Sequence, residues 1–236
     1  MRVHILKMSF ALGSVLNKRE AEKIRGFLGN LFWDNPYAHQ HAQDGTLLYR
    51  YPRIQYKVIN GLCLLIGFNE GLEIAKKAFY NLNSVNLDGD LKEVISRGLE
   101  SYTESFKVSN SGIIYTFLTP WLALNEKNYE AYQKTGNPAQ RKKQLENILA
   151  ANLISISKSL GYTVPAPINT HILKLKEVPT SLKSTPMLGF LGTFSVNFEI
   201  PDYWGIGKSV SRGFGTVKRI SSEEAHGSYS QQKKAF

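Results

Sequence analysis

The sequence predicts an α+β fold of two tandem ferredoxin-like domains, the second of them modified. Hydrophobic periodicity in the first half indicates the order strand, helix, strand, strand, helix, strand. Ferredoxin-like and RNA-recognition-motif domains share that order. The second half repeats part of it, and 236 residues with 42% hydrophobic side chains are enough for two domains of ordinary size. We therefore expect domains at 1–110 and 111–221 and a flexible tail at 222–236.

The first half carries clear helix-start and turn signals. Asn17 is a suitable N-cap for a helix whose apolar residues, from Ala21 to Phe32, recur at helical spacing. Asn60-Gly61 is a strong signal for a tight turn between two strands. The elements expected in order are a strand at 2–10, a helix at 17–32, strands at 47–60 and 62–68, a helix at 72–82 and a strand at 91–108.

The second half contains the longest predicted helix. Pro138 stands in its first turn and Gly161 follows its end, which is the usual asymmetry of helix termini. The residues from Trp121 to Leu124 are expected to lead into a helix before it. The expected strands are at 113–118, at 170–178, at 189–200 and, after a glycine-rich loop, up to residue 220.

Charge limits the classes of partner. Lys and Arg number 29 against 19 Asp and Glu, so the formal net charge is +10. This surplus favours a polyanion, either nucleic acid or an acidic membrane surface, although a basic soluble protein without such a partner can also carry it. The single cysteine, Cys63, lies in an apolar run and predicts a buried strand residue in a reducing compartment. Without a signal peptide or an apolar run of about 20 residues, we expect a cytoplasmic protein.

The most specific segment is a glycine-rich loop from Gly205 to Gly215. Its four glycines follow the pattern G-x-G, five residues, G-x-G, which predicts a sharply turning backbone that approaches a partner closely. Backbone amides, cations and hydroxyls in one loop suit a phosphate-bearing ligand. The loop residues that we expect to contact it are Gly205, Gly207, Lys208, Ser209, Ser211, Arg212, Gly213 and Gly215.

Two nucleotide-binding motifs can be excluded for this loop. Gly207-Lys208-Ser209 resembles the end of a P-loop, but a P-loop needs glycine where this chain has Asp202. A dinucleotide-binding G-x-G-x-x-G motif needs glycine where this chain has Val210. A strand, rather than the required helix, is also predicted after the loop.

His39 and His41 form an H-x-H pair in the loop after the first predicted helix. Histidine titrates near neutral pH, so a pair can supply one base and one acid. The alternatives are two surface histidines or half of a metal site. No cluster of further ligands at metal-binding spacing accompanies the pair, so we expect neither a metal ion nor another cofactor.

The strand after this loop carries aromatic and cationic side chains. Tyr51, Arg53, Gln55 and Lys57 alternate, which predicts one polar face on that strand. Aromatic rings stack on bases and cations meet phosphates, so this face, with Arg50 beside it, is a candidate RNA platform. An exposed amphipathic strand without a ligand is the alternative.

Together, the H-x-H pair, the Tyr-Pro-Arg-Ile-Gln-Tyr-Lys strand and the glycine-rich loop resemble the CRISPR-associated endoribonucleases of the Cas6 family. The resemblance runs across nearly the whole chain, and the glycine-rich loop is the family's most specific signature. The histidine pair followed by a tyrosine-rich strand resembles one subgroup, the H-x-H subgroup. The resemblance implies two ferredoxin-like domains and CRISPR repeat RNA as the partner. Two further partners are compatible with the resemblance: subunits of a CRISPR effector complex, and a second copy of this chain in a homodimer.

The resemblance also implies a chemistry and roles for individual residues. The RNA's own 2′-hydroxyl attacks the neighbouring phosphate without a metal ion, which leaves a 2′,3′-cyclic phosphate and a 5′-hydroxyl. His39 and His41 match the catalytic positions, Tyr49 is a candidate third member, and Lys57 is a candidate for stabilising charge. Arg50, Arg53 and the loop residues named above are the expected RNA contacts. The alternative is a repeat-binding subunit that does not cut RNA.

Overall fold

The computed structural model describes residues 1–236 except 14–15, 17–19, 32–49, 183–184 and 225–236. The chain forms two compact units. Unit 1 consists of Met1–Phe106 together with Ser209–Phe214, and unit 2 consists of Lys107–Lys208 together with Gly215–Phe236. Unit 1 therefore includes a short segment from near the end of the chain.

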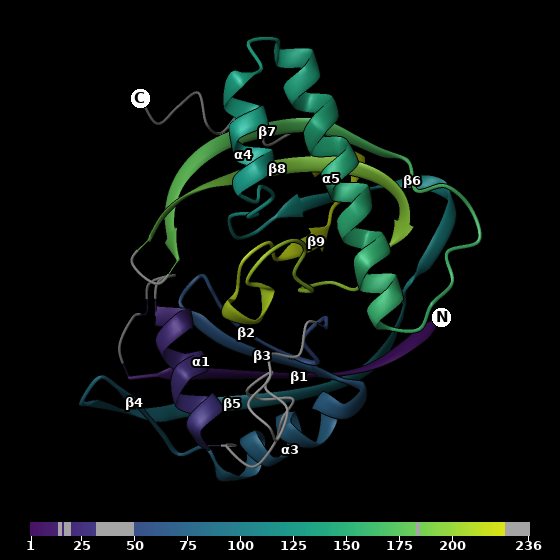
Figure 1. Cartoon of the computed structure of the whole chain (residues 1–236). Helices are drawn as coiled ribbons and strands as arrows, with labels where there is room; N and C mark the ends of the chain where they lie inside the picture. The colour runs from purple at the N-terminus through teal and green to yellow at the C-terminus, as the bar shows by residue number, and fades with distance from the viewer. Residues whose placement is uncertain (14–15, 17–19, 32–49, 183–184, 225–236) are drawn as a thin grey trace. The chain divides into compact units, whose positions relative to one another are not determined.

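Unit 1 contains a five-stranded antiparallel sheet of the order β2-β3-β1-β5-β4 (Figure 1). Without β4, this is the strand order of a ferredoxin-like domain. Its elements are β1 (Arg2–Leu12), α1 (Glu20–Leu31), β2 (Ile54–Ile59), β3 (Leu62–Phe68), the short helix η1 (Asn69–Gly71), α3 (Leu72–Asn81), β4 (Ser84–Leu87) and β5 (Asp90–Ser105).

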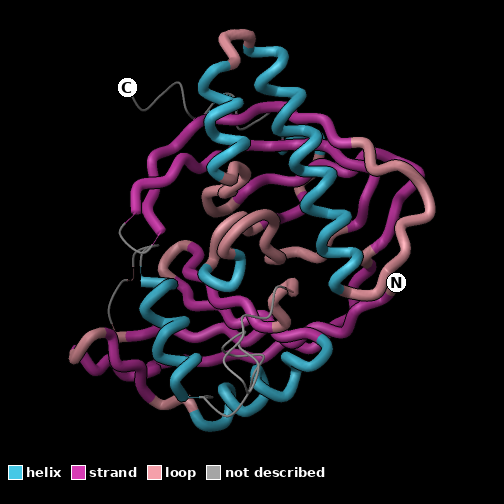
Figure 2. Tube along the Cα trace, viewed as in Figure 1, coloured by secondary structure: helices cyan, strands magenta, loops and turns pink. Residues whose placement is uncertain are grey.

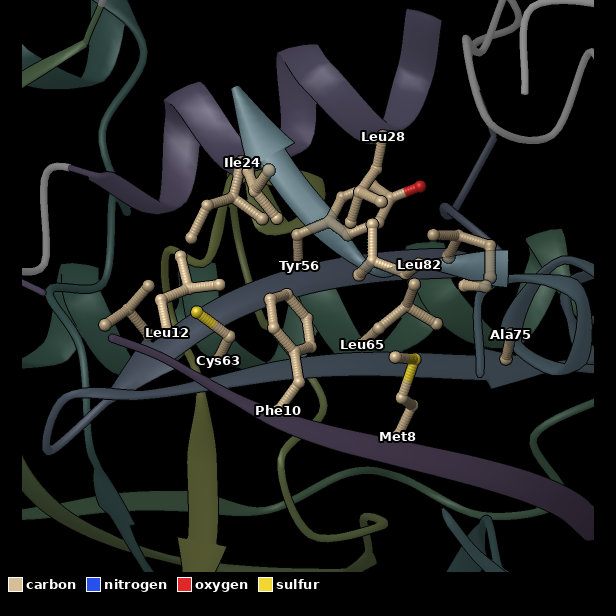
Figure 3. Packing of buried hydrophobic residues seen from close by; sticks show 14 of the residues in the cluster. Met8, Phe10, Leu12, Ile24, Leu28, Tyr56, Cys63, Leu65, Ala75 and Leu82 are labelled. Atoms are coloured by element: carbon tan, nitrogen blue, oxygen red, sulfur yellow. The ribbon is translucent and has the colours of Figure 1, made fainter. Parts of the chain in front are cut away.

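The core of unit 1 lies between this sheet and the helices α1 and α3. Alternate residues of the strands, such as Met8 and Phe10 on β1 and Cys63 on β3, point to the same side. They pack against Ile24 and Leu28 of α1, as Figure 3 shows. The expectation that Cys63 is a buried strand residue is confirmed, because its side chain is fully enclosed.

Two tight hairpins shape unit 1. Asn60 and Gly61 both have positive φ angles, 51° and 79°, so the predicted turn between β2 and β3 is confirmed. Asp88 and Gly89, with φ angles of 58° and 96°, form a second such turn between β4 and β5. Asp-Gly is also a strong hairpin signal, but β4 is so short that the sequence analysis did not identify the strand.

Unit 2 contains a four-stranded sheet of the order β7-β8-β6-β9, which again follows the ferredoxin-like pattern. The place of the second helix is taken by the glycine-rich loop and the single helical turn η2 within it (Figure 2). Its elements are β6 (Lys107–Phe117), α4 (Glu126–Lys134), α5 (Pro138–Ser159), β7 (Thr170–Leu182), β8 (Thr185–Glu199) and β9 (Val217–Arg219), whereas η2 (Val210–Arg212), at the tip of the loop, is part of unit 1.

The long helix α5 begins and ends as its sequence predicts. The Asn137 side chain accepts hydrogen bonds from the backbone amides of Ala139 and Gln140, and Pro138 follows as the first helical residue. Gly161 has a φ of 68°, the left-handed conformation that commonly follows a helix. The helix α5 packs against the edge strand β7.

The hairpin of β7 and β8 is longer than the sequence predicts. The first strand was expected to end at 178 and the second to begin at 189, yet Pro179 pairs opposite Leu188 and Pro186 opposite Ser181. Pro179 is tolerated because β7 is an edge strand. Pro186 lies beyond the part of β8 that pairs with β6.

Within the described chain, no helix is long and apolar enough to cross a membrane.

Candidate nucleic-acid interface

The glycine-rich loop is a hydrogen-bonded hairpin whose stem belongs to unit 2. The Ile206 amide donates to the Gly215 carbonyl at 2.9 Å, and the Val217 amide donates to the Trp204 carbonyl at 2.9 Å. Gly205 forms an isolated bridge with Thr216. The loop is thus an antiparallel pair of extended segments that ends in a tight tip.

The stem lies on the segment between β6 and α4. The Gly215 amide donates to the Pro120 carbonyl at 2.9 Å, and the Lys208 amide donates to the Leu122 carbonyl at 3.1 Å. Between these two residues, Trp121 is fully buried and its ring stacks on Phe117. The sequence analysis missed this role of Trp121. The amides of Ile206, Lys208 and Gly215 are used within the protein, so they do not face a phosphate.

Packing explains two of the four glycines. Gly207 has a φ of 91°, and a Cβ atom there would lie 2.7 Å from the Trp121 ring. Gly215 has a φ of 62°, and a Cβ atom there would collide with the Ile206 carbonyl. Any side chain at these positions would both strain the backbone and clash. The loop's glycine pattern therefore follows from its close approach to Trp121 and to its own opposite segment.

The tip of the loop, Ser209–Phe214, belongs to unit 1, where it packs against α1 and β2. Its apolar residues Val210 and Phe214 are buried, and so is Ser211. The Gly213 amide donates to the Val210 carbonyl at 3.1 Å and closes the helical turn. Ser209 and Arg212 are half-buried, and Lys208 at the stem is exposed. The cations are therefore the accessible part of the loop, whereas Ser211 is not.

The expectation of an exposed polar face on β2 is wrong. Tyr51, Arg53, Gln55 and Lys57 are all buried, at 8%, 7%, 0% and 1% exposure. The residues on the same side of the neighbouring strand β3, namely Leu64, Ile66 and Phe68, are buried as well. Alternation on one strand identifies a polar side but does not reveal whether that side is covered.

Two buried cations at this strand are hydrogen-bonded within unit 1. The Lys57 ammonium donates to Gln55 Oε1 at 2.9 Å, and burial lowers the pKa of Lys57 to about 7. Arg53, expected as an RNA contact, instead donates to Glu70 Oε2 at 3.0 Å and to the Tyr51 carbonyl at 3.2 Å. Its guanidinium is thereby held inside unit 1. Arg50 is half-buried.

His39, His41 and Tyr49 lie outside the described residues. The segment that carries them joins the end of α1, at Leu31, to the approach to β2, at Ile54. Both of these elements contact the loop tip. Chain connectivity thus anchors the histidine segment, at both of its ends, to elements that the glycine-rich loop touches.

The fold and the loop together define a class of protein: two ferredoxin-like units in tandem, with a glycine-rich hairpin in place of the last helix. Comparison with known families agrees and is more specific. Residues 1–105 match the Cas6b N-terminal domain, and residues 107–220 match the Cas6b C-terminal domain. The chain therefore belongs to the Cas6b family.

Similar proteins support this membership. A solved structure described as Cas6b shares 35% identity and superimposes with a TM-score of 0.86, over 93% of this chain and all of the other. A second, described as the CRISPR RNA processing endoribonuclease Cas6b, shares 33% identity with a TM-score of 0.76 over the same shares. Uncharacterized protein MJ0978 of Methanocaldococcus jannaschii is 40% identical over 140 residues, which are 59% of this chain and 95% of that protein.

Proposed function

We propose that this chain is an RNA endonuclease that cuts precursor CRISPR RNA within its repeats and that it belongs to the H-x-H subgroup. Membership of the Cas6b family, one of whose solved members is described as processing CRISPR RNA, supports the substrate class. The net charge of +10 is consistent with a polyanionic partner.

One observation carries the proposal beyond family membership. The loop tip lies against α1 and β2, the two elements between which His39 and His41 occur in the chain. Arg212, the cation of the tip, can therefore hold an RNA phosphate close to the two elements that the histidine segment connects in the chain. In the proposal, the loop holds the phosphate and the histidine pair supplies the acid and the base.

In the proposed reaction, the 2′-hydroxyl oxygen of one nucleotide attacks its own 3′-phosphate. One histidine accepts the 2′-hydroxyl proton, while the other, protonated, donates a proton to the departing 5′-oxygen as the P–O5′ bond breaks. The products are a 2′,3′-cyclic phosphate and a 5′-hydroxyl, and no metal ion takes part. DNA lacks the attacking group and should resist cleavage.

Tyr49 and Lys57 are secondary candidates. With a pKa lowered to about 7, the Lys57 ammonium is only partly charged at neutral pH. Its ammonium is also buried and bonded to Gln55, so any effect on cleavage acts through the structure of β2. We therefore expect any contribution of Lys57 to cleavage to depend on pH, and we assign the principal acid and base to the histidine pair.

The proposal is tested by replacing both histidines, His39→Ala and His41→Ala, and measuring single-turnover cleavage of a repeat RNA. General acid–base catalysis is worth about 100-fold to 10,000-fold, so cleavage should fall by at least about 100-fold while the Kd for RNA stays within about threefold. His4→Ala, an exposed histidine on β1, is the matched control and should cut normally. Full cleavage by the double variant would refute the assignment.

Two further reactions test the chemistry itself. Cleavage should continue in EDTA, and a single 2′-deoxy substitution at the cut site should abolish it. Loss of activity in EDTA would refute the metal-independent mechanism, and cleavage of the deoxy substrate would refute attack by the 2′-hydroxyl. Tight RNA binding without any cleavage would instead support the alternative of a non-catalytic repeat-binding subunit.

A further inference from the structure

Unit 2 carries a second cluster of positively charged residues, which is distant from the glycine-rich loop in the sequence. Arg141, Lys142 and Lys143 follow one another near the start of α5, whose first turn contains no acidic residue. The start of α5 is therefore strongly basic.

These cations border a concavity of about 480 Å³ between the start of α5 and β7. Arg141 and Lys142 line it from the helix, and Lys174 lines it from the strand. The single acidic side chain among its described lining residues is Glu177. The concavity therefore has three cations and one carboxylate at its border.

The Glu177 carboxylate already accepts a hydrogen bond within the protein. The Tyr132 hydroxyl donates to Glu177 Oε1 at 2.7 Å. Burial, and then Glu177 itself, raise the pKa of Tyr132 to about 12, so the hydroxyl remains a donor throughout the physiological range. Glu177 keeps its charge, but three cations against one carboxylate leave the border of the concavity positive.

Arg141 is held in place on one side only. Its guanidinium lies 4.8 Å from the centre of the Tyr132 ring, and its Nε donates to the Thr135 carbonyl at 2.6 Å. Among the described residues, no hydrogen bond from its terminal Nη atoms is found. A guanidinium has five N–H donors in a planar fork that matches phosphate oxygens. Arg141 is thus pre-oriented with donors to spare.

We propose that the concavity bordered by Arg141, Lys142 and Lys174 binds the phosphate backbone of RNA, as a contact site additional to the glycine-rich loop. The proposal rests on the proposed RNA-processing function. Such contacts carry affinity and position the strand but read no sequence. An acidic segment of a protein partner is the competing ligand, which the RNA-binding experiment distinguishes.

The test uses the full chain and a fluorescein-labelled repeat RNA with a 2′-deoxy nucleotide at the cut site. The double variant Arg141→Gln/Lys142→Gln should raise the Kd about tenfold near 0.1 M salt and reduce the slope of log K against log salt by about 1.4, or about 0.7 per lost contact. An RNA of scrambled sequence should lose affinity by the same factor. The matched control, Lys76→Gln/Lys77→Gln, removes two exposed charges from α3 and should leave Kd and slope unchanged.

An unchanged Kd and salt slope in the Arg141/Lys142 variant would overturn the proposal, and so would a loss confined to the repeat sequence. If circular dichroism shows that this variant is misfolded, Lys142→Gln/Lys143→Gln, which changes exposed side chains only, decides the matter with an expected loss of about fivefold. Failure of the wild-type chain to bind repeat RNA would count against the proposed function itself. Normal binding and cleavage by wild type and by both variants would refute this inference alone.

Discussion

Lys57 shows how one buried cation can connect stability to pH. Its ammonium group is enclosed on β2 and hydrogen-bonded to Gln55. Burial disfavours the charged form, so the pKa falls from 10.5 to about 7. Between these two pKa values the unfolded chain binds a proton that the folded chain does not. The wild-type free energy of unfolding should therefore rise with pH in this window.

Replacing Lys57 with methionine should remove this dependence. The difference in free energy of unfolding, wild type minus Lys57→Met, should grow by about 1 kcal/mol per pH unit between about pH 7.5 and 9.5, and level off below about pH 6, where both states hold the proton. Urea denaturation across this range measures it. Lys77→Met, which removes an exposed ammonium from α3, should give a difference that does not change with pH. A flat difference for Lys57→Met would contradict the lowered pKa.

The same strand shows what a sequence leaves undetermined at this scale. The expected alternation holds, because Tyr51, Arg53, Gln55 and Lys57 all lie on one side of the strand. Whether the side is exposed depends on what covers the sheet, which involves residues far away in the chain. The pairings of Arg53 with Glu70 and of Lys57 with Gln55 follow from that burial and not from local pattern.

At the scale of elements, the glycine-rich loop is determined by what it packs on. The sequence shows the spacing of its glycines. It does not show that Gly207 must lack a side chain because it packs on Trp121, which lies more than eighty positions earlier in the chain. By contrast, the β2–β3 hairpin and helix α5 depend on local signals, Asn60-Gly61 and the capped Pro138, and were predicted correctly. Local chemistry predicts elements, and distant packing decides which glycines are required.

Gly207→Ala should destabilise the protein. The substitution forces a left-handed φ on a residue with a Cβ atom, costing about 1–2 kcal/mol, and adds a clash with the Trp121 ring. Chemical denaturation followed by tryptophan fluorescence measures the loss. Gly26→Ala, on the exposed side of α1 with open space around it, should instead stabilise the helix by about 0.5–1 kcal/mol. Equal effects of the two substitutions would contradict this account of the loop.

At the scale of the whole molecule, the path of the chain couples distant parts of the sequence. The loop stem is part of unit 2, yet Ser209–Phe214 completes unit 1 beside α1 and β2. The loop tip thus brings residues from the end of the sequence against elements from its start. The resemblance suggested which residue types to expect in the candidate site. The packing of the tip on α1 and β2 could not be predicted, since no local pattern relates these segments.

This path predicts that a late substitution weakens an early part of the chain. Phe214 is buried on the tip, so Phe214→Ala should remove about 3 kcal/mol of packing from unit 1. Native-state hydrogen exchange should show faster exchange at amides of β2 and α1, while those of β8 keep their protection, because opening free energies follow the contacts that each region loses. Leu173→Ala, an exposed residue of β7 in unit 2, should change neither. Loss of protection in β8 with β2 unaffected would mean that the tip stabilises unit 2 instead, and the proposal that the loop acts together with α1 and β2 would lose its physical basis.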